Sequence, residues 1–150
     1  MTDQLTGAWN QAAGVDEIGR ELERARRSGT SIVIALIDVG SLTKLNDDHG
    51  HVAGDALLEL VGKTVRANVR GLDVIVRYSG DEFVCAMPSL NLAEAALRCQ
   101  EIATELASVN EAYSIAFGLA QAEPIEGVDE LIARAKDDLL ASGRAEGAKH

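Results

Sequence analysis

The sequence has few of the features of a disulfide-rich, secreted or membrane-spanning protein. It contains only two cysteines, Cys85 and Cys99, without the spacing of a metal site, which favours a reducing compartment over a disulfide scaffold. Its longest purely apolar run, residues 32–37, has six residues, whereas a membrane helix needs roughly 20. The opening MTDQLTG lacks the basic and apolar regions of a secretory signal. We therefore expect a soluble, cytoplasmic protein with no membrane segment in this chain.

Positive charge is also scarce. The chain has 14 Lys and Arg against 24 Asp and Glu, a formal net charge of −10, and this charge repels nucleic-acid backbones. No long basic stripe with interleaved aromatic residues is present, so a DNA- or RNA-binding role is not expected. An anionic ligand would need a metal ion or a local basic pocket.

The apolar residues that are present predict a layered α/β (α+β) fold. A hydrophobic fraction of 47% over 150 residues suits a single domain, residues 1–150, with a core of its own. Helical patterns cover residues 10–27, 57–69, 92–106 and 128–140, and strand patterns cover 31–37, two runs within 76–87, and 113–120. The nearly continuous apolar run at 31–37 indicates a central strand that is covered on both faces. This order predicts a ferredoxin-like βαββαβ core, in which a mixed central sheet with an antiparallel hairpin is flanked by helices.

The segment VRYSGDEFVCAM, residues 76–87, predicts a hairpin whose turn contains two adjacent acids, Asp81 and Glu82. Acidic residues are common in turns, so alone they indicate only solvation. However, Asp38 follows the buried strand at 31–37, and if that strand lies beside the hairpin the three carboxylates meet at one edge of the sheet. Such oxygen ligands suit Mg²⁺ and leave positions for substrate phosphates. Phosphoryl transfer is therefore the leading chemistry.

Three segments, DQLTGAWN, DVGSLTKLNDDHGHVAGD and RYSGDEF, resemble the GGDEF domain of diguanylate cyclases in order and spacing. The resemblance runs from about Asp3 to Arg144. It implies a palm-like fold of the nucleotide-cyclase type and a nucleotidyltransferase that condenses two GTP into cyclic di-GMP with Mg²⁺ or Mn²⁺. It also implies a transient homodimer in which each protomer supplies one half-site, and a role in bacterial signalling with a sensor domain or partner protein outside this chain.

The resemblance assigns catalytic and metal-binding roles to the acidic edge. It implies that Asp38, Asp81 and Glu82 are the catalytic acids. Asp38 and Asp81 would be metal ligands, together with Val39, and Glu82 would lie on the phosphate side.

It also assigns substrate-binding roles, to Asn46, Asp55, Ser79, Gly80 and Arg144. Asn46 and Asp55 match the guanine-reading pair, because a carboxylate accepts from the ring N–H and amino group of guanine, which adenine does not offer. For Asp55 the alternative is an ordinary N-cap or first-turn position at the start of an amphipathic helix. Ser79 replaces the first Gly of the signature, and Gly80 lets the nucleotide come close to the backbone.

Two further motifs have weaker or competing interpretations. Arg70 and Asp73 form an R-x-x-D that matches the inhibitory cyclic di-GMP site of the family, where the alternative is a surface salt bridge. The second inhibitory arginine of the family falls near Glu101, with Arg98 one turn earlier. The histidines of the HGH sequence at 49–51 have no Cys or third His as a further metal ligand, so a solvated loop or a packing role is the better interpretation.

The sequence departs from the family at its phosphate-binding cations. Thr43 stands where a lysine is usual, with Lys44 one residue along, and Gly40 replaces the second acid of the family's D-x-D. Near the C-terminus, the usual lysine is either missing or replaced by Gly143. Three hypotheses follow: an active cyclase, a catalytically silent domain that binds GTP or cyclic di-GMP and contacts another protein, and a purely structural dimerisation module.

Overall fold

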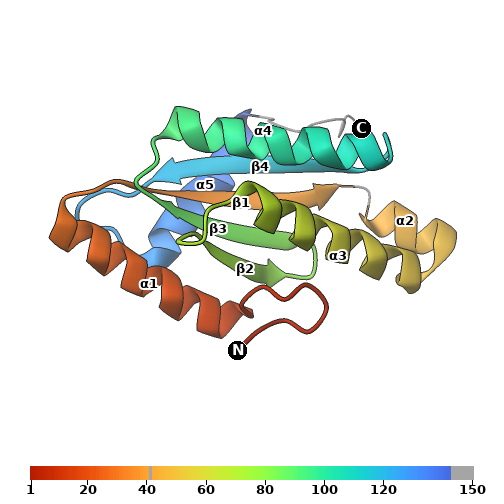
Figure 1. Cartoon of the computed structure of the whole chain (residues 1–150), viewed down its shortest axis with the longest axis horizontal. Coiled ribbons are helices and arrows are strands. Elements are labelled where there is room, and N and C mark those ends of the chain that lie inside the picture. The colour runs from red at the N-terminus through yellow and green to blue at the C-terminus, as the bar shows by residue number, and fades with distance from the viewer. Residues whose placement is uncertain (41, 143–150) are drawn as a thin grey trace.

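A computed structural model describes residues 1–40 and 42–142 of the chain. The elements in chain order are α1 Gln11–Ser28, β1 Ile32–Gly40, α2 Leu42–His49, α3 His51–Asn68, β2 Val74–Ser79, β3 Glu82–Pro88, α4 Leu92–Val109, β4 Ser114–Gln121 and α5 Val128–Ser142 (Figure 1). Every predicted helix and strand is present. The structure adds α2, a short helix that the sequence patterns did not predict.

The four strands form one sheet in the order β2-β3-β1-β4. β1 pairs antiparallel with β3 and β4, and β2 pairs antiparallel with β3. This is the predicted ferredoxin-like arrangement, but the expectation of a mixed sheet was wrong. The two crossovers join strands that run parallel but are not neighbours, since β3 lies between β1 and β2, and β1 lies between β3 and β4.

The sheet separates two apolar cores, and alternate residues of β1 contribute to each. Val33 and Ile37 belong to the core shared with α3 and α4, whereas Ile34 and Leu36 belong to the core shared with α1 and α5. Figure 1 shows α3 and α4 in front of the sheet and α5 behind it. Strand β1 is therefore covered on both faces, as its apolar run predicts.

No helix in the described part of the chain could span a membrane, because none is both long and apolar enough to do so.

Helix α2 and helix α3 are separated by a sharp backbone turn at Gly50. Gly50 has φ of 85°, a conformation that favours glycine because it has no Cβ. Helix α2, with the sequence LTKLNDDH, has no buried residue, so it lacks the apolar stripe that would predict a helix. Figure 1 shows α2 at one end of the molecule, beyond the end of β1. The family-like segment at residues 38–55 therefore folds as a strand end followed by two helices.

Candidate active site

The structure brings the three predicted acids together at the end of β1 and the tip of the β2–β3 hairpin. Asp38 is directly opposite Glu82 in the β1–β3 register. Ser79 pairs with Glu82 across the hairpin, which leaves Gly80 and Asp81 as a two-residue turn. The backbone N–H of Val39 donates to the carbonyl oxygen of Asp81 at 2.8 Å, so the turn is tied to the end of β1.

The acidic edge, formed by Asp38, Asp81 and Glu82, carries an excess of negative charge. Burial, together with the negative charges of Asp81 and Glu82, raises the pKa of Asp38 to about 6, while the positive charge of Lys136 acts to lower it. Across the described part of the chain, no group of three or more His, Cys, Asp or Glu side chains is arranged to hold a metal ion by itself. A metal at this edge would therefore need backbone or ligand oxygens as well as carboxylates.

Asp38→Asn is expected to stabilise the metal-free protein at pH 7 by about 1 to 2 kcal/mol, a value reduced for partial solvent screening. The pKa of Asp38 is about 6 in the folded chain and 3.8 as the reference, so between these values the folded state binds more protons. Stability of the parent therefore falls as the pH rises from about 4 to 6. Urea unfolding in EDTA at pH 4 and pH 7 measures the difference. Equal stability of parent and variant at pH 7 contradicts this prediction. Asp16→Asn is the control, since Asp16 is exposed on α1.

The side chains of Lys136 and Ser79 both hydrogen-bond the carboxylate of Glu82, and neither contact was predicted from the sequence. The ammonium group of Lys136, on α5, donates to Glu82 Oε2 at 2.9 Å, and the Ser79 hydroxyl donates to Glu82 Oε1 at 2.8 Å. Burial acts to raise the pKa of Glu82, but the hydrogen bonds from Lys136 and Ser79 outweigh it and the pKa is lowered. Ser79, which replaces the first Gly of the signature, therefore has a side chain that orients an acid of the site.

The N-terminal motif DQLTG supports the hairpin that carries these acids. Asp3 accepts from the backbone N–H of Thr6 at 2.9 Å and from its hydroxyl at 2.8 Å, and it pairs with Arg77 at 3.2 Å. Arg77 in turn donates to the carbonyl oxygen of Gly80 at 2.8 Å. Burial opposes the ionisation of Asp3, but these contacts outweigh it and lower its pKa. The motif therefore acts as a brace that fixes the acidic turn.

The predicted guanine-reading residues lie on neighbouring helices. The Oδ1 atom of Asn46, on α2, is buried and has no hydrogen-bond partner among the described residues. It packs against Gly54 of α3, where an added Cβ would lie only 1.7 Å from that oxygen. Asp55 is exposed and follows Gly54. It lies inside α3, which begins at His51 with Gly50 as its N-cap, so the alternative of Asp55 as an N-cap is wrong.

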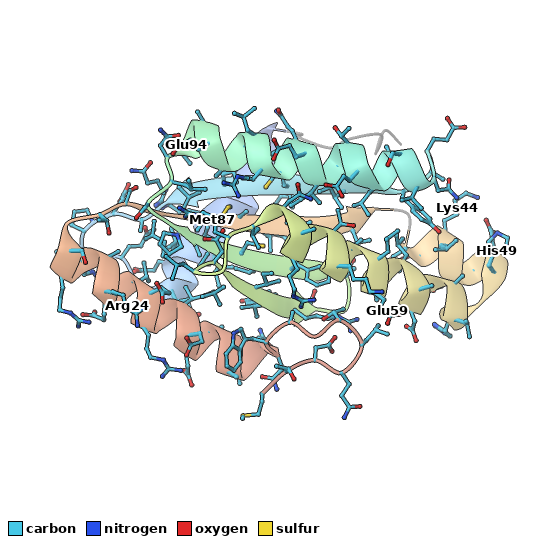
Figure 2. The ribbon with its side chains drawn as sticks, in the orientation of Figure 1. Arg24, Lys44, His49, Glu59, Met87 and Glu94 are labelled. Carbon is cyan, nitrogen blue, oxygen red and sulfur yellow. The ribbon has the colours of Figure 1, made fainter. Side chains whose placement is uncertain are left out.

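The other described residues that were predicted to lie near the substrate are open to solvent. Gly80 has no left-handed φ, and an added Cβ would meet nothing within 4 Å, so it leaves open space but does not need glycine for its dihedral angles. Thr43 and Lys44 are exposed, and Lys44 pairs with Asp48 at 3.0 Å. Figure 2 shows Lys44 and His49 at the end of the molecule where α2 lies. Arg144 lies outside the described residues, as does Gly143.

The histidines of the HGH sequence are both exposed. Neither belongs to a metal-binding cluster among the described residues. Their exposure agrees with solvation, but the expected loop is wrong, because His49 ends α2 and His51 begins α3.

Arg70 and Asp73 of the R-x-x-D motif form an ion pair, as the alternative interpretation of the motif expects. Arg70 Nη2 lies 3.3 Å from Asp73 Oδ1, and the backbone N–H of Arg70 donates to Asp73 Oδ2 at 2.9 Å. The guanidinium also donates to the carbonyl oxygen of Pro88, while its Nε is buried without a partner among the described residues. Arg98 donates to the carbonyl oxygen of Asn68 at 2.9 Å. These contacts fix Arg70 and Asp73 in the segment between α3 and β2, where the side chain of Arg70 is partly exposed.

Comparison with known sequences identifies the same family over nearly the whole chain. The family model described as "Diguanylate cyclase, GGDEF domain" matches residues 1–149. Diguanylate cyclase DgcS of Shewanella oneidensis is 31% identical over 150 residues, which cover 98% of this chain and 50% of the relative. Diguanylate cyclase DosC of Escherichia coli is 31% identical over 150 residues, covering 95% and 33% respectively. The chain thus spans half or less of the length of these relatives.

Comparison with solved structures gives the same fold. The GGDEF domain of DgcB from Caulobacter crescentus, in complex with c-di-GMP, superimposes with a TM-score of 0.87 at 28% identity, covering 95% of this chain and 90% of that chain. The diguanylate cyclase SiaD of Pseudomonas aeruginosa, in complex with its activator SiaC, gives a TM-score of 0.87 at 26% identity over 95% of this chain and 58% of that chain.

Proposed function

This chain belongs to the GGDEF domain family of diguanylate cyclases, and we propose that it condenses two molecules of GTP into cyclic di-GMP with Mg²⁺ or Mn²⁺. The observation that carries the proposal is the acidic edge. Asp38 is half-buried with Asp81 and Glu82 close enough to raise its pKa, and this charge is what a divalent cation and its bound phosphates would neutralise.

The residues at this edge fit such a cation. Asp38 and Asp81 would be its carboxylate ligands, and the carbonyl oxygen of Val39 would add a third oxygen. Mg²⁺ commonly takes one or two protein carboxylates and fills its other positions with water and phosphate oxygens. When bound, the metal would neutralise charge on the triphosphate and the leaving pyrophosphate.

The rest of the site would position the guanine and the phosphate chain. The exposed carboxylate of Asp55 is an acceptor, which suits the donor edge of guanine. Asn46 would add a second acceptor by turning its buried, unpartnered Oδ1 outward. Gly80 leaves open space beside the acidic turn. Arg144 would supply a cation to the phosphates, in place of the family's lysine.

The product requires two copies of this site. One acidic edge would hold one GTP, whereas cyclic di-GMP contains two equivalent GMP units joined by two phosphodiester bonds. In each bond-forming step a ribose 3′-hydroxyl of one nucleotide attacks the α-phosphorus of the other, and pyrophosphate leaves. A transient two-fold homodimer meets this requirement, because it presents the same site twice in opposed orientation.

Asp55→Ala is expected to weaken GTP binding roughly tenfold to hundredfold, since it removes a charged acceptor of two guanine donors. ATP binding should be weak in both proteins. Calorimetric titration with GTP and ATP in the presence of Mg²⁺ measures both affinities. Glu59→Ala is the matched control, since Glu59 is exposed on α3 one turn further along the helix (Figure 2). If Asp55→Ala discriminates between GTP and ATP as well as the parent does, Asp55 does not contact guanine.

A second candidate function is that of a regulatory domain that binds cyclic di-GMP and signals to another protein. Two observations favour it: Thr43 stands at a usual lysine position, and the R-x-x-D motif is present with the side chain of Arg70 partly exposed. The similar DgcB domain was solved with c-di-GMP, and the similar SiaD with an activator protein. A sensor domain or partner protein would then control this chain in the bacterial cytoplasm.

Arg70→Ala is expected to lower the affinity for cyclic di-GMP roughly tenfold, because a guanidinium hydrogen-bonds both phosphate and guanine. Calorimetry with cyclic di-GMP provides the measurement. Arg20→Ala removes an arginine from another i,i+3 ion pair, with Glu17 on α1, and should leave the affinity unchanged. If both variants bind like the parent, the R-x-x-D motif is only a surface ion pair.

A further inference from the structure

The acidic edge contains a cation that belongs to the chain itself. Lys136 Nζ lies 2.9 Å from Glu82 Oε2, and Lys136 also interacts electrostatically with Asp38 and Asp81. The other oxygen of Glu82 accepts from the Ser79 hydroxyl. Both oxygens of Glu82 are therefore occupied by groups of the protein, and one of the three negative charges at this edge is already balanced.

The fold holds the backbone of Lys136 close to the sheet. Helix α5 packs directly on β4, where a Cβ added to Gly118 would lie 2.1 Å from the carbonyl oxygen of Ala135. Ala135 and Leu131 are fully buried, which anchors the preceding turn of α5. The side chain of Lys136 itself is 46% exposed, whereas that of Glu82 is 14% exposed. The backbone of Lys136 is thus fixed in place, while its ammonium group, at the end of a partly exposed side chain, is free to change partner.

We propose that Lys136 competes with the divalent cation for the acidic edge and leaves Glu82 for the phosphates when GTP binds, so that metal and nucleotide bind cooperatively. A metal entering the nucleotide-free site would be placed near a positive charge, which opposes its binding. The phosphates of GTP would give the ammonium group a second anionic partner, and lysine is a common phosphate ligand. This inference rests on the proposed function of the site.

Lys136 would also provide a positive charge at a site where the two lysines usual in the family are replaced. Thr43 and the region of Gly143 stand at the lysine positions of the family, and Lys44 is engaged with Asp48 on α2. Lys136 is on α5, and it stands seven residues before Gly143 in the sequence. It would therefore approach the phosphates from the α5 side of the sheet.

The test measures Mn²⁺ binding to the full chain by electron paramagnetic resonance, first without nucleotide. We expect Lys136→Met to bind Mn²⁺ about tenfold more tightly than the parent, because a nearby like charge is removed. Lys136→Arg keeps the charge and should bind as the parent does. Lys63→Met is the matched control, since Lys63 is exposed on α3, across the sheet from α5. Circular dichroism checks that each variant is folded.

The same titration with an unreactive GTP analogue tests the cooperativity. The analogue should tighten Mn²⁺ binding more in the parent than in Lys136→Met, by about tenfold, because only the parent releases a competing cation. Equal Mn²⁺ affinities and equal coupling in the parent and Lys136→Met would overturn this inference and leave the proposed function standing. Failure of every folded variant to bind Mn²⁺, with or without the analogue, would overturn both.

Discussion

Asp81→Ala is expected to abolish cyclic di-GMP formation while leaving the fold intact. Asp81 is exposed at the hairpin tip. Its carbonyl oxygen, which accepts from Val39, is unchanged by the substitution. What is lost is one of the two carboxylates proposed to hold the metal, and metal charge stabilisation contributes several kcal/mol to such a transition state. The rate should fall at least about hundredfold. Chromatography of the nucleotides after incubation with GTP and Mg²⁺ gives the result.

The matched control is Asp16→Ala, which removes an exposed acid from α1 and should leave the rate unchanged. Thermal unfolding of both variants checks that the loss is not one of stability. If Asp81→Ala makes as much product as the parent, the metal assignment at the hairpin is wrong.

Gly118→Ala is expected to destabilise the protein by about 3 kcal/mol, near the upper end of the usual range for overpacking. Gly118 lies on the face of β4 that meets α5. An added Cβ would come within 2.1 Å of the Ala135 carbonyl oxygen and 2.5 Å of the Leu139 backbone nitrogen. Because both contacts are to backbone atoms, the whole helix must move. Urea unfolding followed by circular dichroism measures the loss.

Gly71→Ala provides the comparison for this prediction. An added Cβ at Gly71 would meet nothing within 4 Å, and its φ is not left-handed, so its stability should stay within about 0.5 kcal/mol of the parent. A Gly118→Ala protein as stable as Gly71→Ala would show that α5 does not pack on β4 as described. A second consequence follows if α5 moves, because Lys136 then leaves Glu82.

The strands and long helices could be predicted because their apolar residues repeat with a clear period. The run at residues 32–37 is buried on both faces, as its composition indicates. Helix α2 could not be predicted in this way, since none of its residues is buried and no apolar stripe appears. The direction of neighbouring strands was also out of reach, because periodicity does not give strand order. Placing β3 between β1 and β2 makes the sheet antiparallel.

The acidic edge could be predicted because its members stand at the ends of strands. Asp38 follows an apolar run and Asp81 lies in a two-residue turn, so a shared edge follows from one strand pairing. Lys136 was missed because it reaches Glu82 across 54 residues of sequence, and exposed lysines on a helix are ordinarily solvated. One signal was available: Arg134, Ala135 and Lys136 stand where the family pattern has R-A-D. A reversal of charge at that position indicates a changed environment.

The central claim is that this chain makes cyclic di-GMP from GTP at the acidic edge, with two protomers contributing. The most direct measurement is the initial rate of cyclic di-GMP formation, with GTP and Mg²⁺, over a series of protein concentrations. The account predicts product, and a rate per protomer that rises with concentration as the homodimer forms. Bound GTP without cyclic di-GMP at any concentration would contradict it and favour the regulatory function.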